Sequence, residues 1–164
     1  MNRRGFTIVE LIIVITIMAI LLVLAVVNLR GTQISARDDE RKTDTESIAL
    51  NLEIYYNNSA YSASSAIRYP STGLIGAETT NLPDIDPRVL TTPGATSSSL
   101  VAATNAVQTV AGVTPQPTTA QYVYQPIDGT GALCVGGATQ CRKFNLYYRL
   151  EANNTVYMRM SKNQ

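Results

Sequence analysis

The residues of this 164-residue chain that could carry chemistry are few and scattered. There are 12 acidic side chains, two cysteines and no histidine. Without histidine the chain cannot form a Ser–His or Cys–His pair. The carboxylates lie on a charged stretch and in turns, and no glycine-rich phosphate-binding loop precedes a helix. The sequence therefore predicts a protein that is not an enzyme and that needs no cofactor.

One carboxylate lies in an unusual place. Glu10 is inside an apolar run, residues 6–29, in which the other polar residues are Thr7, Thr16 and Asn28. As a helix this run would be roughly 36 Å long, enough to cross a hydrocarbon core of about 30 Å. A carboxylate costs about 2.5–3.5 kcal/mol at the centre of a membrane helix and somewhat less near its end. A simple anchor would gain nothing from Glu10.

The residues that flank the run indicate its orientation. Arg3 and Arg4 precede it, which predicts that the amino terminus is cytoplasmic and that the rest of the chain emerges outside. A secretory signal would have a shorter apolar region followed by a small-x-small cleavage site, and this run is long with no clear site after it. A single-pass anchor fits the length but does not account for Glu10.

Residues 1–10, Met-Asn-Arg-Arg-Gly followed by Phe-Thr-Ile-Val-Glu, resemble the processing site of type IV prepilins and type II secretion pseudopilins. The resemblance implies that prepilin peptidase cuts between Gly5 and Phe6 and that the new amine of Phe6 is methylated. A glycine suits a backbone that must enter a protease cleft. Glu10 would then neutralise the amine of an adjacent subunit and set the axial stagger between subunits, because an uncompensated charge is disfavoured at low dielectric.

The likeness to pseudopilins and related pilins continues over residues 26–31, with two departures. Val27 stands where many members have proline, and Ala19 where many type IV pilins have glycine. Those residues help part of the helix to melt on assembly in some relatives, so the resemblance does not extend to that melting.

The resemblance implies a structural subunit of a type IV pilus-like filament. The alternatives are a pseudopilin of a type II secretion or DNA-uptake machine, and a monomeric membrane-anchored surface domain. The implied partners are further copies in a helical filament, prepilin peptidase, membrane lipid before assembly, and an assembly platform. The chain would lie in the cytoplasmic membrane and then in a surface pilus or periplasmic pseudopilus. A net charge of +1 does not support a nucleic-acid partner.

Beyond the apolar run, helix-compatible spacing continues to about residue 58, where Asn57-Asn58-Ser59 predicts a stop. Ile48, Leu52, Tyr55 and Tyr56 form a face that we expect to pack on a sheet. The charged residues 37–44 are either a solvated helix face or lateral contacts between subunits. Within them, Asp38 and Lys42 have the spacing of a favourable i,i+4 pair.

The carboxy-terminal forty residues predict strands. Residues 122–125 read as a short strand, and 143–151 and 155–160 alternate cleanly. A three-residue loop, 152–154, with one asparagine in the left-handed conformation would pair Leu150 with Val156. The same register pairs Tyr148 with Met158, Leu146 with Met160, Arg149 with Tyr157, and Tyr147 with Arg159.

Cys134 and Cys141 enclose six residues, two of them glycine. On the outer side of a membrane they are expected to form a disulfide, since a metal site would need further ligands. Asp84 and Asp86 beside prolines could suggest calcium, but two carboxylates fall short of the six to eight oxygens that calcium takes. Turn capping is the better interpretation there, and no metal site is predicted.

These patterns together predict an α+β, ladle-shaped type IV pilin-like fold: a long N-terminal helix, transmembrane in its first half, packed on a small C-terminal antiparallel sheet. The divisions are a leader (1–5), a transmembrane and polymerisation helix (6–29), an amphipathic continuation (30–58), a variable αβ-loop region (59–121) and a C-terminal sheet with a disulfide loop (122–164). Within the variable region, 98–112 could be a short helix or two weak strands.

Overall fold

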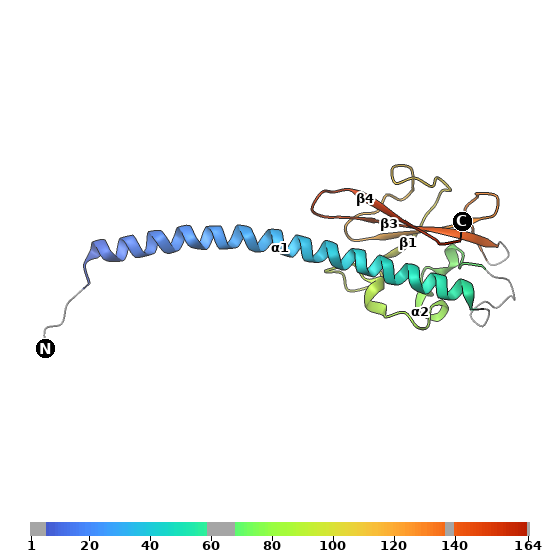
Figure 1. Cartoon of the computed structure of the whole chain (residues 1–164), viewed down its shortest axis with the longest axis horizontal. Coiled ribbons are helices and arrows are strands. Elements are labelled where there is room, and N and C mark those ends of the chain that lie inside the picture. Colours follow the sequence, from blue (N-terminus) through green and yellow to red (C-terminus); the bar gives the residue numbers. More distant parts are fainter. Residues whose placement is uncertain (1–5, 59–67, 137–139, 164) are drawn as a thin grey trace. The chain divides into compact units, whose positions relative to one another are not determined.

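The computed structural model describes residues 6–58, 68–136 and 140–163. Gly5 and the rest of the predicted leader lie outside them. The chain separates into two compact units, residues 1–36 and residues 37–164, and each is described here by itself. Helix α1, Ile8–Asn57, begins in the first unit and ends in the second, where the asparagine-rich stop was predicted (Figure 1).

The described part of the first unit is an exposed apolar helix. Every side chain from Phe6 to Val26 is exposed, and an 18-residue window of α1 has a mean hydropathy of 3.1 with none of it buried. By length and composition α1 can cross a membrane. Neither Ala19 nor any other residue from 8 to 57 interrupts it.

The second unit contains a four-stranded sheet with the strand order β1-β2-β3-β4. The strands are β1 (Leu100–Ala102), β2 (Tyr122–Asp128), β3 (Cys141–Arg149) and β4 (Val156–Met160). β2, β3 and β4 are antiparallel neighbours, whereas β1 is parallel to β2. The fold is therefore α+β as predicted, and β2, β3 and β4 form the predicted C-terminal antiparallel sheet. The whole sheet is mixed because β1, which precedes that region in sequence, adds a parallel strand at its edge. Short helices lie between α1 and the sheet in sequence: α2 (Glu78–Asn81) and the 3-10 helices Thr72–Leu74 and Pro87–Leu90.

The main core lies between α1 and one face of the sheet. Ile48, Leu52 and Tyr55 are buried in one cluster with residues of the strands and of the preceding loops, and Tyr56 packs against it. This confirms the face predicted from the helical spacing. The strand residues of this cluster are Leu100, Tyr122, Tyr124, Cys141, Phe144 and Leu146.

The opposite face of the sheet is also covered. Ala103, Val113, Val123 and Tyr147 form a second buried cluster. The segment that covers this face is fastened by Gln125, whose side-chain NH2 donates to the carbonyl oxygens of Asn105 (2.9 Å) and Val107 (3.1 Å).

The predicted register of the β3–β4 hairpin was wrong by one residue. The observed partners are Arg149–Val156, Tyr148–Tyr157, Tyr147–Met158, Leu146–Arg159 and Asn145–Met160. The amide of Leu150 donates to the carbonyl of Thr155 (3.0 Å), which closes a four-residue loop instead of a three-residue one. An asparagine does take the left-handed conformation, Asn154 at φ 54°. Val156 and Met158 pack against the second cluster, so the apolar residues of β4 face the covering segment and not the helix.

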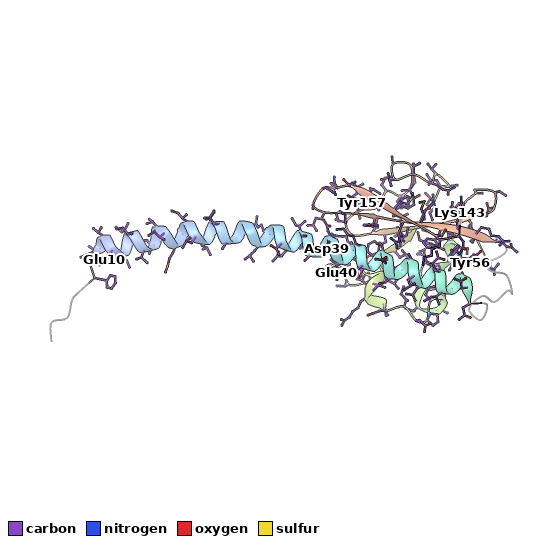
Figure 2. All side chains as sticks on the ribbon, in the orientation of Figure 1. Glu10, Asp39, Glu40, Tyr56, Lys143 and Tyr157 are labelled. Atoms are coloured by element: carbon purple, nitrogen blue, oxygen red, sulfur yellow. A yellow bond between two sulfur atoms is a disulfide. The ribbon has the colours of Figure 1, made fainter. Side chains whose placement is uncertain are left out.

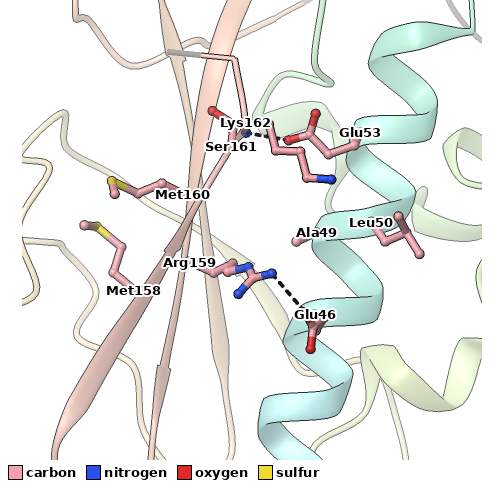
Figure 3. Close-up of a pocket in the computed structure, with 9 residues that line it drawn as sticks. All are labelled: Glu46, Ala49, Leu50, Glu53, Met158, Arg159, Met160, Ser161 and Lys162. Carbon is pink, nitrogen blue, oxygen red and sulfur yellow. Dashed lines mark hydrogen bonds and ion pairs between the residues drawn. The ribbon is translucent and has the colours of Figure 1, made fainter.

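The register error also removes the two predicted cation–aromatic pairs. Arg149 donates instead to the carbonyl oxygens of Pro117 (2.7 Å) and Asn154 (2.9 Å). Tyr157 stacks on Tyr148 with ring centroids 5.7 Å apart. Arg159 points towards α1, where it pairs with Glu46 at 2.9 Å beside a groove of about 620 Å³ between α1 and β4 (Figure 3).

Candidate functional site

Glu10 lies in the first turn of α1 and is exposed. Its Oε2 accepts hydrogen bonds from the amide (3.1 Å) and the hydroxyl (2.9 Å) of Thr7, and its own amide donates to the Thr7 hydroxyl (3.3 Å). This reciprocal arrangement is a capping box, which satisfies amides that a helix amino terminus leaves free. We did not predict it, although Thr-x-x-Glu before an apolar run is the sequence signal for it.

The cap leaves part of the Glu10 carboxylate available. Both hydrogen bonds end at Oε2, and no described residue donates to Oε1. The flanking residue Phe6, the first one that the structure describes, is 83% exposed. An exposed carboxylate oxygen in the first turn of an apolar helix can bind a cationic group from outside the chain. The other described polar side chain of the first four turns, Thr16, donates to the carbonyls of Ile12 (3.0 Å) and Ile13 (2.8 Å). It is thereby satisfied within its own helix, as lipid requires.

The charged stretch 37–44 is largely used inside the second unit. Arg41 is 3% exposed and its guanidinium contacts Asp38 (2.8 Å), Glu151 (3.5 Å) and the carbonyl of Thr119 (3.1 Å). Asp38 also accepts the amides of Glu151 (2.7 Å) and Ala152 (2.9 Å). Burial alone would raise the pKa of Asp38, but these donors outweigh it and lower that pKa. The stretch is therefore partly a clamp on the β3–β4 loop, which neither interpretation of the sequence included.

The predicted pair of Asp38 with Lys42 was wrong. Lys42 pairs with Asp39 at 2.9 Å, because Asp38 faces the β3–β4 loop. Both members of the observed pair are exposed, with half or more of each side chain accessible.

Cys134 and Cys141 form a disulfide with an S–S distance of 2.00 Å. Both residues are buried, and their carbonyls accept the amides of Thr72 (3.1 Å) and Tyr69 (2.9 Å) respectively. The disulfide therefore closes the excursion between β2 and β3, and the backbone of its two cysteines also binds Tyr69 and Thr72. Asp86 caps the 3-10 helix Pro87–Leu90, its Oδ1 accepting the amide of Arg88 at 2.9 Å. Among the described residues no group of three or more acidic, cysteine or histidine side chains could hold a metal.

Comparison with known proteins bears on the amino-terminal segment of the chain. No curated protein and no solved structure matches the chain. The sequence model of the prokaryotic N-terminal methylation motif matches residues 1–26, the segment that contains Gly5, Phe6, Glu10 and most of the apolar run. The chain thus carries the prepilin-type cleavage and methylation motif of a type IV pilin-like or pseudopilin-like precursor.

Proposed function

We propose that this protein is the structural subunit of a type IV pilus-like filament. Prepilin peptidase cuts it between Gly5 and Phe6, the amine of Phe6 is methylated, and the mature chain polymerises through its apolar helix. Before assembly the helix lies in the cytoplasmic membrane, with the second unit on the outer side.

The exposed apolar part of α1 is the observation that carries this proposal. From Ile8 to Val26 this segment has no partner among the described residues of the chain, and its large side chains are 42–78% exposed. Apolar surface gains about 25 cal/mol per Å² when it leaves water, so such a helix needs lipid or other helices around it. In a polymer with these helices at its centre, neighbouring helices take the place of lipid around each apolar surface. No further ligand is needed.

Glu10 supplies the register of that polymer. Cleavage leaves a positive amine at Phe6, in surroundings where an unpaired charge is strongly disfavoured. The free Oε1 of Glu10 in an adjacent subunit can accept that amine while Oε2 keeps its bonds to Thr7. A subunit shifted by one helical turn would leave both charges unpaired, so the correct stagger is selected.

A pseudopilus of a secretion or DNA-uptake machine is the second candidate, since residues 26–31 resemble major pseudopilins. Both candidates share the processing and the register. They differ in where the polymer lies, on the cell surface or in the periplasm.

Two measurements on one preparation test the proposal. Intact mass analysis of the protein from cells that contain prepilin peptidase should show the loss of residues 1–5 and one added methyl group. Electron microscopy of material sheared from those cells should show filaments that contain the chain. A mature protein that keeps Met1 would contradict the proposal. Processed chain that is found only as membrane monomers would contradict it too.

A further inference from the structure

The charged side chains of α1 in the second unit are mostly paired within the chain. Asp39 pairs with Lys42 (2.9 Å), Glu46 with Arg159 (2.9 Å) and Arg37 with Glu151 (2.6 Å). Glu40 differs: it is exposed, next to these pairs on α1, and makes no hydrogen bond or ion pair with any residue that the structure describes.

A pocket of about 640 Å³ lies at the other end of the same unit, lined by residues that include Tyr56, Asp128, Arg142 and Lys143. Lys143 is only partly exposed, and within the described residues its ammonium has no hydrogen bond or ion pair. Arg142 uses one nitrogen for Gln140 (2.7 Å).

The one carboxylate of this pocket is already engaged. Oδ1 of Asp128 accepts the amide (2.8 Å) and hydroxyl (2.7 Å) of Thr130 and the amide of Ala132 (3.0 Å). Two cations against one carboxylate leave the lining with a single net positive charge. That charge matches one incoming carboxylate.

An irregularity in β3 places the two cations together. Ile127 pairs with Lys143, but its neighbour Asp128 pairs with Cys141, so Arg142 is an extra residue in the ladder. Such a bulge redirects side chains out of the strict alternation of a strand. Arg142 and Lys143 consequently line the same pocket although they are adjacent in sequence.

Glu40 and this pocket cannot meet within one chain. Glu40 and Tyr56 lie on α1 sixteen residues apart, which is about 24 Å along a helix. Figure 2 shows Glu40 near the beginning of the second unit and Tyr56 with Lys143 at its far end. A second copy shifted by about 24 Å along the helix axis would bring its Glu40 to the level of the pocket of the first.

We propose that Glu40 of one copy binds the pocket formed by Tyr56, Arg142 and Lys143 of a second copy. This inference rests on the proposed function, because it supplies a contact between subunits of the filament. The contact joins different surfaces of two identical chains, and head-to-tail contacts of that kind build open helical polymers when the rotation between copies does not close a ring. A partly buried, unpaired ammonium gains from an incoming carboxylate, and the opposite charges of Glu40 and the pocket favour one orientation of approach.

Zero-length cross-linking of wild-type filaments tests this contact directly. A carbodiimide condenses a carboxylate with an amine that touches it, and we expect an amide between Glu40 and Lys143 in the peptide map. Since Glu40 lies about 24 Å along α1 from Tyr56, which lines the same pocket as Lys143, that cross-link can only join two copies. The exposed pair Asp39–Lys42 is the internal control for the reagent. Recovery of the Asp39–Lys42 product without a Glu40–Lys143 product would overturn the proposal.

Charge reversal gives a second, independent test. Glu40→Lys and Lys143→Glu should each lower the yield of sheared filaments by about threefold or more. The double variant should restore the yield. Glu46→Gln is the matched control, because Glu46 is exposed on the same helix but already binds Arg159 (Figure 3). Filaments of normal yield from both single variants, or no recovery in the double variant, would refute this contact. A wild-type protein that forms no filament would instead refute the proposed function.

Discussion

The phenol of Tyr122 on β2 donates a hydrogen bond of 2.9 Å to Oδ2 of Asp44 on α1. Tyr122 is fully buried and Asp44 is 7% exposed. Burial raises the pKa of Asp44 to about 6, although the Tyr122 hydrogen bond and the nearby Arg41 act in the opposite direction. The contact therefore joins helix to sheet through a carboxylate that folding makes harder to ionise.

This contact predicts a pH dependence of stability. Between about pH 4 and pH 6 the folded state holds a proton on Asp44 that the unfolded state releases, so the contribution of Asp44 to the free energy of unfolding falls as pH rises through 6. Asp44→Asn removes the charge but keeps the acceptor for Tyr122. We expect the variant to be about 1–2 kcal/mol more stable than wild type at pH 7 and equal to it near pH 3.5.

Denaturant unfolding of the full chain in detergent at the two pH values measures this difference. The carboxylates that do not interact with Asp44 titrate alike in both proteins, so the comparison reports Asp44 and the groups that its charge affects. Equal stability of the two proteins at pH 7, or a less stable variant, would show that Asp44 is not held in a costly ionised state.

The contacts around Arg41 predict that removing Asp38 lowers the free energy of unfolding much more than removing its neighbour Asp39. Asp38→Ala would leave the buried guanidinium of Arg41 without its shortest ion pair and would remove the acceptor of two loop amides. We expect a loss of about 2–4 kcal/mol in the free energy of unfolding. Asp39→Ala, which removes an exposed pair, should cost less than about 1 kcal/mol. Similar losses in the two variants would contradict the clamp.

The disulfide predicts that the stability of the fold depends moderately on redox state. It closes a loop between residues seven apart in sequence, for which the chain-entropy relation gives roughly 2–3 kcal/mol. The variant with both Cys134 and Cys141 replaced by alanine should lose about that amount, and dithiothreitol should lower the stability of wild type but not of the variant. A variant as stable as oxidised wild type would indicate that the disulfide adds nothing to the fold.

The long helix was predictable because its signals are local. Glu10 and the apolar run, the stop at Asn57 and the buried face at Ile48 and Leu52 follow from spacing along one element. The Thr7–Glu10 cap has an equally local signal, because Thr-x-x-Glu is the sequence pattern of a capping box. Its carboxylate therefore has two roles that the sequence allows, one within the helix and one towards a second charge.

The hairpin register was not predictable from alternation alone. The argument for pairing Leu150 with Val156 assumed one apolar and one solvated face of the sheet. Tyr147 and Met158 instead lie under a covering segment that shows no hydrophobic period in the sequence, so both faces of the sheet bury apolar residues. The parallel pairing of β1 was hidden for a related reason, because three residues, Leu100–Ala102, are too few to show a period.

The proposed role of Glu10 in setting the subunit register can be separated from its role in the cap by variants at two positions. Glu10→Gln removes the charge but keeps the capping box, since glutamine serves at that position as well as glutamate. Thr7→Ala removes the side-chain half of the cap and keeps the charge. Both variants retain Gly5 and Phe6 and should be processed normally.

The most direct measurement is the amount of sheared filament from cells that express each variant at equal levels, with mass analysis confirming removal of residues 1–5. We predict that Thr7→Ala assembles at close to the wild-type level. Glu10→Gln should be processed but should yield about tenfold fewer filaments, because the amine of Phe6 is then left unpaired at low dielectric. Normal assembly of Glu10→Gln together with failure of Thr7→Ala would contradict a register set by charge and would assign Glu10 to helix capping alone.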